Sequence, residues 1–382
     1  MSFAKDTKWV SIWGSAVSIG ENRPETYGKN ITLCYPVPIP FSGSRIHMSF
    51  DNYCGTEDIT IAKAVVLYKD VFYPVCVADK ESFSIKAGES ITTDDLPLAV
   101  DAGDSLEIRF YLQDYTQMRS TVFMSGPLTS GRYAVGDYTA QKEIPIDQSR
   151  STNYFYFLNN ISLCTSKDNH AIVCFGDSIT AQDWPDYLKL RCQSENFGHT
   201  SIIRRATSGS RILREYDCIT YESYGLKGTN RFTHEVPTEG ADILIIQQGI
   251  NDIIHPVGTD VNAFRPMSDL PTADELIEGL CWYIKTARSY GYQVYVGTLL
   301  PIEGWRTYAP FREELKEAYN DFIRSTKLID GCIDFAKALQ NPARPTAFME
   351  QYDSGDHLHP SAEGYRTMAD CVPAKLLQKY RN

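Results

Sequence analysis

The chain has 382 residues, more than most single domains, and its apolar fraction of 43% suffices for two hydrophobic cores. Its 48 acidic residues outnumber 37 Lys and Arg, which gives a formal net charge of -11. This balance argues against a nucleic-acid partner or an anionic membrane surface, because either requires a basic face. No stretch approaches the roughly 20 apolar residues of a membrane span, and the start lacks a signal-peptide pattern, so we expect a cytoplasmic protein.

The ten cysteines are scattered along the chain, and no C-x-x-C pair occurs. Several lie within apolar runs, as Cys174 does in AIVCF. Buried free thiols are therefore expected rather than disulfides or zinc ligands. We expect neither a metal ion nor a cofactor, and the sequence does not indicate an oligomeric state.

Residues 1–168 contain short β-type runs separated by Gly, Pro, Asn and Asp. The runs are ITLCYPV, RIHMSF, ITIAKAVVLY, VFYPVCVA, LEIRFYL and NYFYFLNNISL. No 3.6-residue periodicity is evident. Frequent strands with turns between them predict an antiparallel β-sandwich or jelly-roll domain.

In residues 169–382 apolar strands alternate with helical patterns, and the polar stretch CTSKDNH at the junction marks the domain boundary. This alternation predicts an α/β domain with a parallel sheet covered on both faces. Gly291 is placed to end a long helix that begins near Asp274. Ser361, after Pro360, is placed to cap the last helix.

The first apolar run of this half stops abruptly in IVCFGDSITAQDW, residues 172–184. One interpretation is structural, with a tight turn at Gly176 and a helix cap at Asp177 or Ser178. The other is chemical, because a serine at a strand-to-helix turn exposes its hydroxyl beside the N–H groups of a helix N-terminus. The two roles are compatible.

A serine nucleophile needs a general base, usually a histidine held by an acid. In DHLHP, Asp356 and His359 are three residues apart in a turn-prone loop, so the carboxylate can fold back to hold Nδ1–H and leave Nε2 free. His357 is adjacent to Asp356, which suits this geometry less well. The alternative is an ordinary solvated loop.

Loops beyond the carboxyl ends of the parallel strands are where the partners of Ser178 are expected. The backbone N–H groups of Ser178 and Gly209 and the side-chain amide of Asn251 supply three donors for the anion of a tetrahedral intermediate. Asn251 is followed by Asp252, which is also ordinary turn chemistry.

Asp177 and His255 are further candidates for substrate contacts, although an His-Pro pair after a strand also fits a plain turn. Arg231 and His234 are expected in a long loop between strands, where surface polarity is the simpler interpretation and a lid or a substrate contact is the alternative.

The motif residues Ser178 in GDSIT, Gly209 in SGS, Asn251 in GIND and His359 in DHLHP resemble, in this order, those of the GDSL or SGNH hydrolases. The resemblance implies a flavodoxin-like three-layer α/β core. It also implies Ser178 as the nucleophile, His359 as the base with Asp356, and an oxyanion hole at Ser178, Gly209 and Asn251. The second motif, RRATSGS, departs from the family pattern, which has an Asn before this loop.

The beginning of the chain resembles family members that carry a WVxxW segment, here Trp9 to Trp13, in a β-rich domain ahead of the hydrolase core. The expected activity is hydrolysis of short acyl esters, acetyl foremost, of sugars or oligosaccharides, because the segments after the motif strands are polar and rich in glycine. The alternatives are a general short-chain carboxylesterase or lipase, and a carbohydrate-binding protein with an inert hydrolase core.

Overall fold

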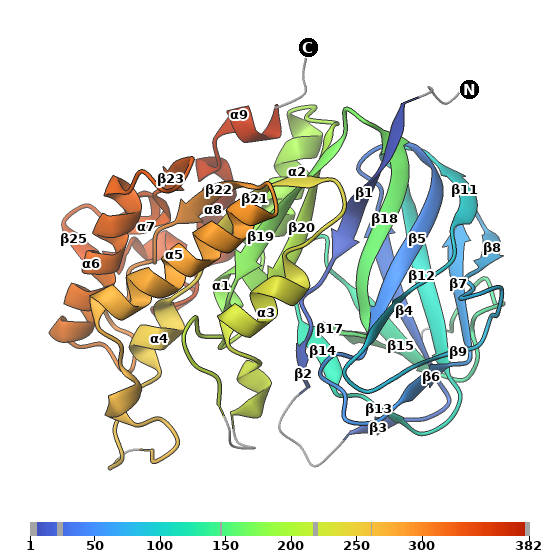
Figure 1. The fold of residues 1–382 in the computed structure, drawn as a ribbon, viewed down its shortest axis with the longest axis horizontal. Coiled ribbons are helices and arrows are strands. Elements are labelled where there is room, and N and C mark those ends of the chain that lie inside the picture. The colour runs from blue at the N-terminus through green and yellow to red at the C-terminus, as the bar shows by residue number, and fades with distance from the viewer. Residues whose placement is uncertain (1–5, 21–25, 146, 217–220, 261, 379–382) are drawn as a thin grey trace.

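The computed structural model describes residues 6–20, 26–145, 147–216, 221–260 and 262–378. Cys218 lies outside these ranges. Residues 1–5, at the start of the chain, and residues 379–382, at the end of the expected last helix, also lie outside them. Figure 1 shows a β-rich region built from the first half of the chain beside a region of strands and helices built from the second.

The β-rich region contains two main antiparallel sheets. The first has the order β1-β18-β5-β10, with β11 also paired to β5. Its strands are β1 (Thr7–Gly14), β5 (Gly43–Asp51), β10 (Ser90–Thr92), β11 (Leu96–Val100) and β18 (Leu158–Ser166). The second has the order β16-β15-β4-β12-β7-β8. Its strands are β4 (Ile31–Pro38), β7 (Lys63–Tyr68), β8 (Val71–Pro74), β12 (Ser105–Leu112), β15 (Gly131–Val135) and β16 (Ser149–Thr152).

Aromatic side chains pack between these two sheets. Phe50 of β5 meets Phe110 of β12 edge-on, with ring centroids 5.3 Å apart, and Phe110 also meets Tyr35 of β4 at 5.8 Å. All three side chains are buried. The sheets therefore face each other across one apolar layer, as expected for a sandwich.

Two of the expected strands are divided in the structure. The run ITIAKAVVLY forms β6 (Ile59–Ile61), which pairs with β9 (Phe83–Ile85), and β7 of the large sheet. The run NYFYFLNNISL forms β17 (Tyr154–Tyr156) and β18, separated by Phe157 with φ +59°. Each run changes sheets at its break. The short sheets also contain β2 (Ser18–Ile19), β14 (Ser120–Phe123), β3 (Tyr27–Gly28) and β13 (Thr116–Gln117).

The second half of the chain contains a five-stranded parallel sheet of order β20-β19-β21-β22-β23. Its strands are β19 (His170–Gly176), β20 (Thr200–Ala206), β21 (Ala241–Gln247), β22 (Gln293–Gly297) and β23 (Gly331–Ile333). The chain passes from β19 to β20 on one side and then to β21 on the other. This reversal brings the loops after these three strands together, where ligands bind in such sheets.

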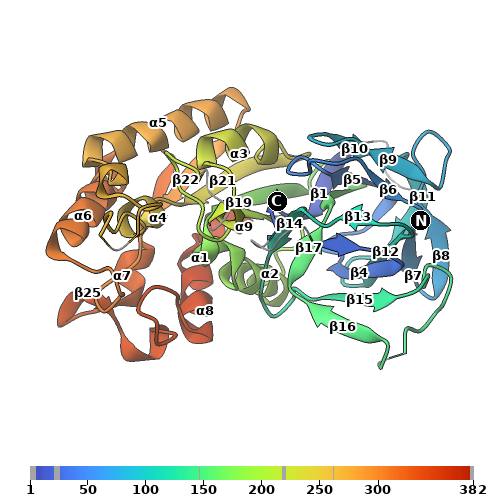
Figure 2. The same cartoon turned by 90° about the horizontal axis from the view of Figure 1, so that it is seen from below.

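Helices cover both faces of this sheet, with α3 and α5 on one side and α2 and α8 on the other (Figure 2). The longer helices are α2 (Trp184–Ser194), α3 (Gly228–Glu235), α5 (Ala273–Ser289), α6 (Pro310–Ser325) and α8 (Ala362–Cys371). The shorter ones are α1 (Ser178–Ala181), α4 (Ile250–Ile254), α7 (Phe335–Leu339) and α9 (Ala374–Leu377). The remaining elements are the β24 (Gln340–Asn341) and β25 (Arg344–Phe348) pair and the 3₁₀ turns η1 (Glu222–Tyr224), η2 (Met267–Asp269) and η3 (Glu350–Tyr352).

The expected helix caps are confirmed. Helix α5 ends at Ser289, and Gly291 follows with φ +88°. The Ser361 side chain accepts a hydrogen bond from the N–H of Gly364 and caps α8. The expected last helix is interrupted, because Pro373 has no N–H and holds Val372 extended, so α8 ends before α9 begins.

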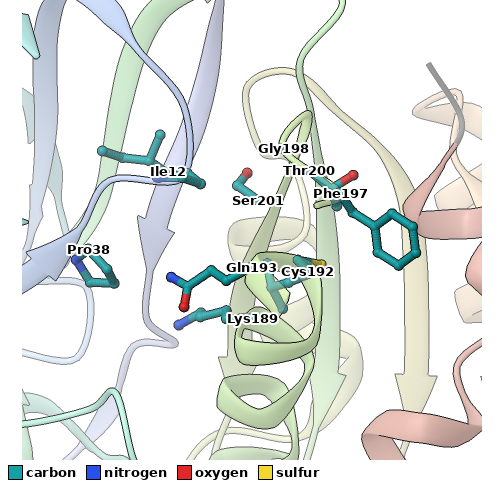
Figure 3. A pocket seen from close by; sticks show the side chains of 11 residues that line it. Ile12, Pro38, Lys189, Cys192, Gln193, Phe197, Gly198, Thr200 and Ser201 are labelled. Atoms are coloured by element: carbon teal, nitrogen blue, oxygen red, sulfur yellow. The ribbon is translucent and has the colours of Figure 1, made fainter. Parts of the chain in front are cut away.

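Buried polar contacts join the two regions. The Arg205 guanidinium, on β20, donates hydrogen bonds to the carbonyl groups of Ser15 and Asn159 and to Oδ1 of Asn160. A pocket at the same boundary lies between Ile12 and residues of α2 (Figure 3). Its volume is about 70 Å³. It is too small for more than a few water molecules.

Candidate active site

Ser178 begins helix α1 directly beyond the buried strand β19. The preceding Asp177 is extended, and its side chain accepts a hydrogen bond from the N–H of Ile179 at 3.1 Å, so it caps the helix. A Cβ atom at Gly176 would lie 2.4 Å from the carbonyl oxygen of Gln247, which explains the glycine. The turn therefore presents the serine hydroxyl at the carboxyl edge of the sheet, as the sequence predicted.

His359 reaches this hydroxyl from the loop before α8. Its Nε2 lies 2.9 Å from Oγ of Ser178, and its Nδ1 lies 2.7 Å from Oδ2 of Asp356. The other carboxylate oxygen accepts from the N–H groups of Leu358 and His359 at 2.9 and 2.8 Å. With Nδ1–H donated to the carboxylate, Nε2 is the acceptor for the serine proton.

The electrostatics of Asp356 suit this role. Partial burial acts to raise the pKa of its carboxyl group, but the hydrogen bonds from His359 and from two backbone N–H groups outweigh that effect. The net result is a pKa well below the usual range of aspartate. The carboxylate stays charged and holds the imidazole in one orientation.

His357, the second histidine of the loop, is directed elsewhere. Its Nδ1 lies 2.5 Å from Oδ2 of Asp353, and its backbone has φ +63°. A backbone hydrogen bond from Ser354 to the carbonyl group of His359 closes the loop. The two histidines of DHLHP therefore have separate acid partners.

The loops that carry Gly209 and Asn251 are bonded to each other. Nδ2 of Asn251 donates to the carbonyl oxygen of Ser210 at 3.1 Å, and Gly209 has φ +79°. Asp252 accepts from the N–H groups of Ile212 and Leu213, at 2.8 and 3.0 Å, and fixes the same loop to α4.

Within the described part of the chain, the backbone N–H groups of Ser178 and Gly209 donate no hydrogen bond. An amide nitrogen such as Nδ2 of Asn251 carries two hydrogens, so its bond to Ser210 leaves one for a ligand. The three expected oxyanion donors thus lie on adjoining loops, and their role in stabilising an anion stays a prediction.

Asp177 and His255 are both buried. Burial raises the pKa of Asp177 to about 7. His255 lies 3.0 Å from the Tyr216 hydroxyl through Nδ1 and stacks on Tyr224, with ring centroids 4.9 Å apart. Burial, aided by Arg265, lowers its pKa well below the usual value for histidine. A substrate contact by either residue stays a prediction.

The expectation that Arg231 and His234 lie in a surface loop is wrong. Both belong to α3, where buried Arg231 pairs with Glu235 at 2.8 Å. Arg231 also donates to Oγ of Ser210 at 2.8 Å, so it supports the loop that carries Gly209. The i,i+4 spacing of Arg231 and Glu235 was the available signal for this helix.

Sequence reasoning also missed Tyr224. An added Cβ at Gly209 would lie 2.2 Å from Cδ1 of this tyrosine, so its ring covers one side of the glycine. No sequence motif marks Tyr224, and its contact with Gly209 is evident only in the folded structure.

A serine, a histidine and an aspartate linked in this order at the carboxyl edge of a parallel sheet define a site of the serine-hydrolase class. Residues 174–367 match the model of the GDSL-like Lipase/Acylhydrolase family. That match spans half of the chain, which therefore belongs to this family and is an ester hydrolase by class.

Similar solved structures cover just over half of the chain. A GDSL-like lipase from Bacteroides thetaiotaomicron is 18% identical, with a TM-score of 0.38 over 56% of this chain and 89% of that chain. A lipase/acylhydrolase from Enterococcus faecalis is 21% identical, with a TM-score of 0.41 over 55% and 96%. The acetyl xylan esterase AlAXEase is 20% identical, with a TM-score of 0.38 over 53% and 97%. No curated protein matches the chain.

Among the described residues, no group of three or more His, Cys, Asp or Glu side chains is arranged to hold a metal ion. In the same ranges, no helix is long and apolar enough to cross a membrane.

Proposed function

We propose that this protein removes short acyl groups, acetyl foremost, from sugars or oligosaccharides through an acyl-enzyme on Ser178. The observation that carries the proposal is the chain of contacts from Oγ of Ser178 through the His359 imidazole to Asp356, at 2.9 and 2.7 Å. These contacts favour an enzyme over a carbohydrate-binding protein with an inert hydrolase core, whose function does not require them.

The proposed reaction uses these contacts. Nε2 of His359 takes the hydroxyl proton as Oγ of Ser178 attacks the acyl carbon. The N–H groups of Ser178 and Gly209 and the amide of Asn251 stabilise the oxyanion. The intermediate collapses as the imidazolium gives its proton to the leaving alcohol, and water then releases the acid by the same steps in reverse.

Two features support a short acyl group. Tyr224 covers one side of Gly209, and the loop from Gly209 to Leu213 is bonded to α4 through Asp252. A site closed by bonded loops suits a small acyl group, whereas a long chain needs an extended apolar groove.

A lipase with a longer acyl preference is the second candidate. It is favoured by exposed apolar side chains near the carboxyl edge, Phe264 and Met267 after α4 and Phe311 at the start of α6. Exposed apolar patches often mark interaction sites.

The test compares kcat/KM for acetylated xylo- and manno-oligosaccharides with values for p-nitrophenyl acetate and octanoate. We expect acetate release from at least one sugar ester, and acetate to be preferred over octanoate. Preference for octanoate, or no release from any sugar ester, would overturn the carbohydrate assignment while leaving the serine mechanism intact.

A further inference from the structure

A second pocket lies at the boundary of the two regions, beside the loop that carries Gly209. It has a volume of about 230 Å³. The residues that matter here are Ser18, Phe123 and Tyr154 from the β-rich region and Thr207, Ser208 and Tyr224 from the α/β region. Drug-sized ligands occupy pockets of about 300–1,000 Å³, so this pocket suits a smaller ligand, such as one sugar ring.

Two buried hydroxyl groups of this pocket have no hydrogen-bond partner among the described residues. They are Oγ of Ser18 and Oγ1 of Thr207, and each side chain is 2% exposed. A Cβ atom at Gly225 would lie 2.5 Å from Oγ of Ser18 and 3.0 Å from the methyl carbon Cγ2 of Thr207, so both side chains pack closely on this glycine. Buried hydroxyls without partners are uncommon in folded proteins, and each of these two can donate a hydrogen bond to a ligand or accept one from it.

Aromatic rings complete the walls. Phe123 and Tyr154 meet edge-to-face, with ring centroids 5.6 Å apart, on the short sheet of β2, β14 and β17. Tyr224 contributes a ring from the other region. Rings beside isolated hydroxyls are the combination that binds a pyranose, whose C–H faces are apolar and whose rim carries hydroxyl groups.

The pocket adjoins the reacting groups. Thr207 and Ser208 immediately precede Gly209, and the N–H of Thr207 donates to the carbonyl oxygen of Gly176 at 3.2 Å, two residues before Ser178. The Tyr224 ring lines the pocket and also packs on Gly209. A ligand held here therefore lies next to the predicted oxyanion loop.

We propose that this pocket binds a sugar ring of the alcohol part of the ester, so that the β-rich region forms part of the substrate site. The inference rests on the proposed function, since it names where the alcohol binds. It gives the β-rich region a direct part in substrate recognition.

Thr207→Val and Ser18→Ala each remove one hydroxyl without adding bulk, and Tyr154→Ala removes a ring. The control is Thr60→Val, the same change at an exposed threonine. Thr60 lies on β6, and its hydroxyl is hydrogen-bonded to that of Ser84 on β9. For each protein, kcat/KM is measured for an acetylated methyl xyloside and for p-nitrophenyl acetate. We expect the ratio of the two values to fall about tenfold in the pocket variants and to stay constant in the control.

Binding is measured separately, by calorimetry of the same acetylated xyloside with the Ser178→Ala protein, alone and combined with Thr207→Val. We expect the second change to weaken binding about tenfold, with thermal unfolding temperatures near that of the control. An unchanged ratio and unchanged binding would overturn the pocket assignment. Failure of the wild-type protein to hydrolyse either ester would instead overturn the proposed function, and the calorimetry would still decide the pocket.

Discussion

Replacing Ser178 or His359 with alanine breaks the contact between nucleophile and base at 2.9 Å. Because these residues act as a unit, each variant should lose about 10⁴- to 10⁶-fold in kcat. Steady-state kinetics on p-nitrophenyl acetate measures the loss, and thermal unfolding checks that the fold is kept. Substantial activity in pure Ser178→Ala protein would end the mechanism.

Asn251→Ala removes a side-chain donor that lies beside the Ser210 carbonyl group. We expect kcat to fall by about 10²- to 10³-fold with little change in KM, which is the usual cost of losing one oxyanion-hole donor. A raised KM at constant kcat would show that Asn251 binds ground-state substrate instead.

Gly209→Ala meets two obstacles, the positive φ of +79° and the Tyr224 ring 2.2 Å from the added Cβ. Gly88→Ala is the matched control, because its φ is +77° and an added Cβ contacts nothing within 4 Å. Both variants bear the backbone strain of about 1–2 kcal/mol. Only Gly209→Ala should also displace the loop and lower kcat; equal kinetics in the two variants would contradict this.

The pH profile separates the roles of His359 and Asp356. A lowered carboxyl pKa means that the stabilisation from Asp356 is present above the unfolded value of 3.8 and is lost only below it. The Asp356 carboxylate therefore stays charged between pH 5 and 9, and a change of kcat/KM in this range does not come from Asp356. The imidazole of His359 accepts the serine proton only when it is neutral, so a profile of kcat/KM that stays flat into acid would count against His359 as the base.

At the scale of single elements, helix α1 depends on the cap at Asp177. Burial raises the pKa of this carboxyl group from 3.8 to about 7, so its proton stabilises the fold below about pH 4 and that stabilisation is lost as pH rises through 7. Asn keeps the capping oxygen but does not ionise.

In the wild-type protein the free energy of unfolding should therefore fall as pH rises from 4.5 to 8. In Asp177→Asn protein this fall should be smaller, by no more than about 4 kcal/mol. Denaturant unfolding of both proteins at the two pH values measures this difference. Asp252, whose pKa burial raises to about 6, is present in both proteins, and its charge contributes to the raised pKa of Asp177. Parallel pH dependences would refute the assignment.

Elements with local signals were predictable from the sequence. The turn at Gly176 and the end of α5 at Gly291 depend on adjacent residues, and both are confirmed. Helix α3 was missed because Arg231 resembles a surface residue until its distant partner, Ser210, is in place. The division of the run 59–68 into two strands depends on pairing partners that no local pattern reveals.

At the scale of the whole molecule, the sequence indicated where short β-type runs give way to alternating strand and helix patterns. It did not indicate how the two regions join. β18 ends at Ser166 and β19 begins at His170, close to the predicted boundary at residues 168 and 169, and the boundary itself stays a prediction. Arg205 lies in the buried strand β20, and only the folded structure shows that it bonds across the boundary to Ser15 and Asn159.

Arg205→Met should lower the free energy of unfolding by about 2–5 kcal/mol, because it removes three hydrogen bonds of a buried guanidinium and leaves Oδ1 of Asn160 without a donor. Arg45→Met, at an exposed pair with Asp95, is the control and should cost at most about 1 kcal/mol. Denaturant unfolding measures both. Equal losses would show that Arg205 does not hold the two regions together.

The most direct test of the account is the site of covalent modification. A fluorophosphonate ester phosphonylates an activated serine hydroxyl and releases fluoride, and peptide mass spectrometry locates the adduct. We predict one adduct per chain, on Ser178, with activity lost in proportion to labelling and no adduct in His359→Ala protein. Labelling of a different serine, or full esterase activity in protein labelled at Ser178, would contradict the account.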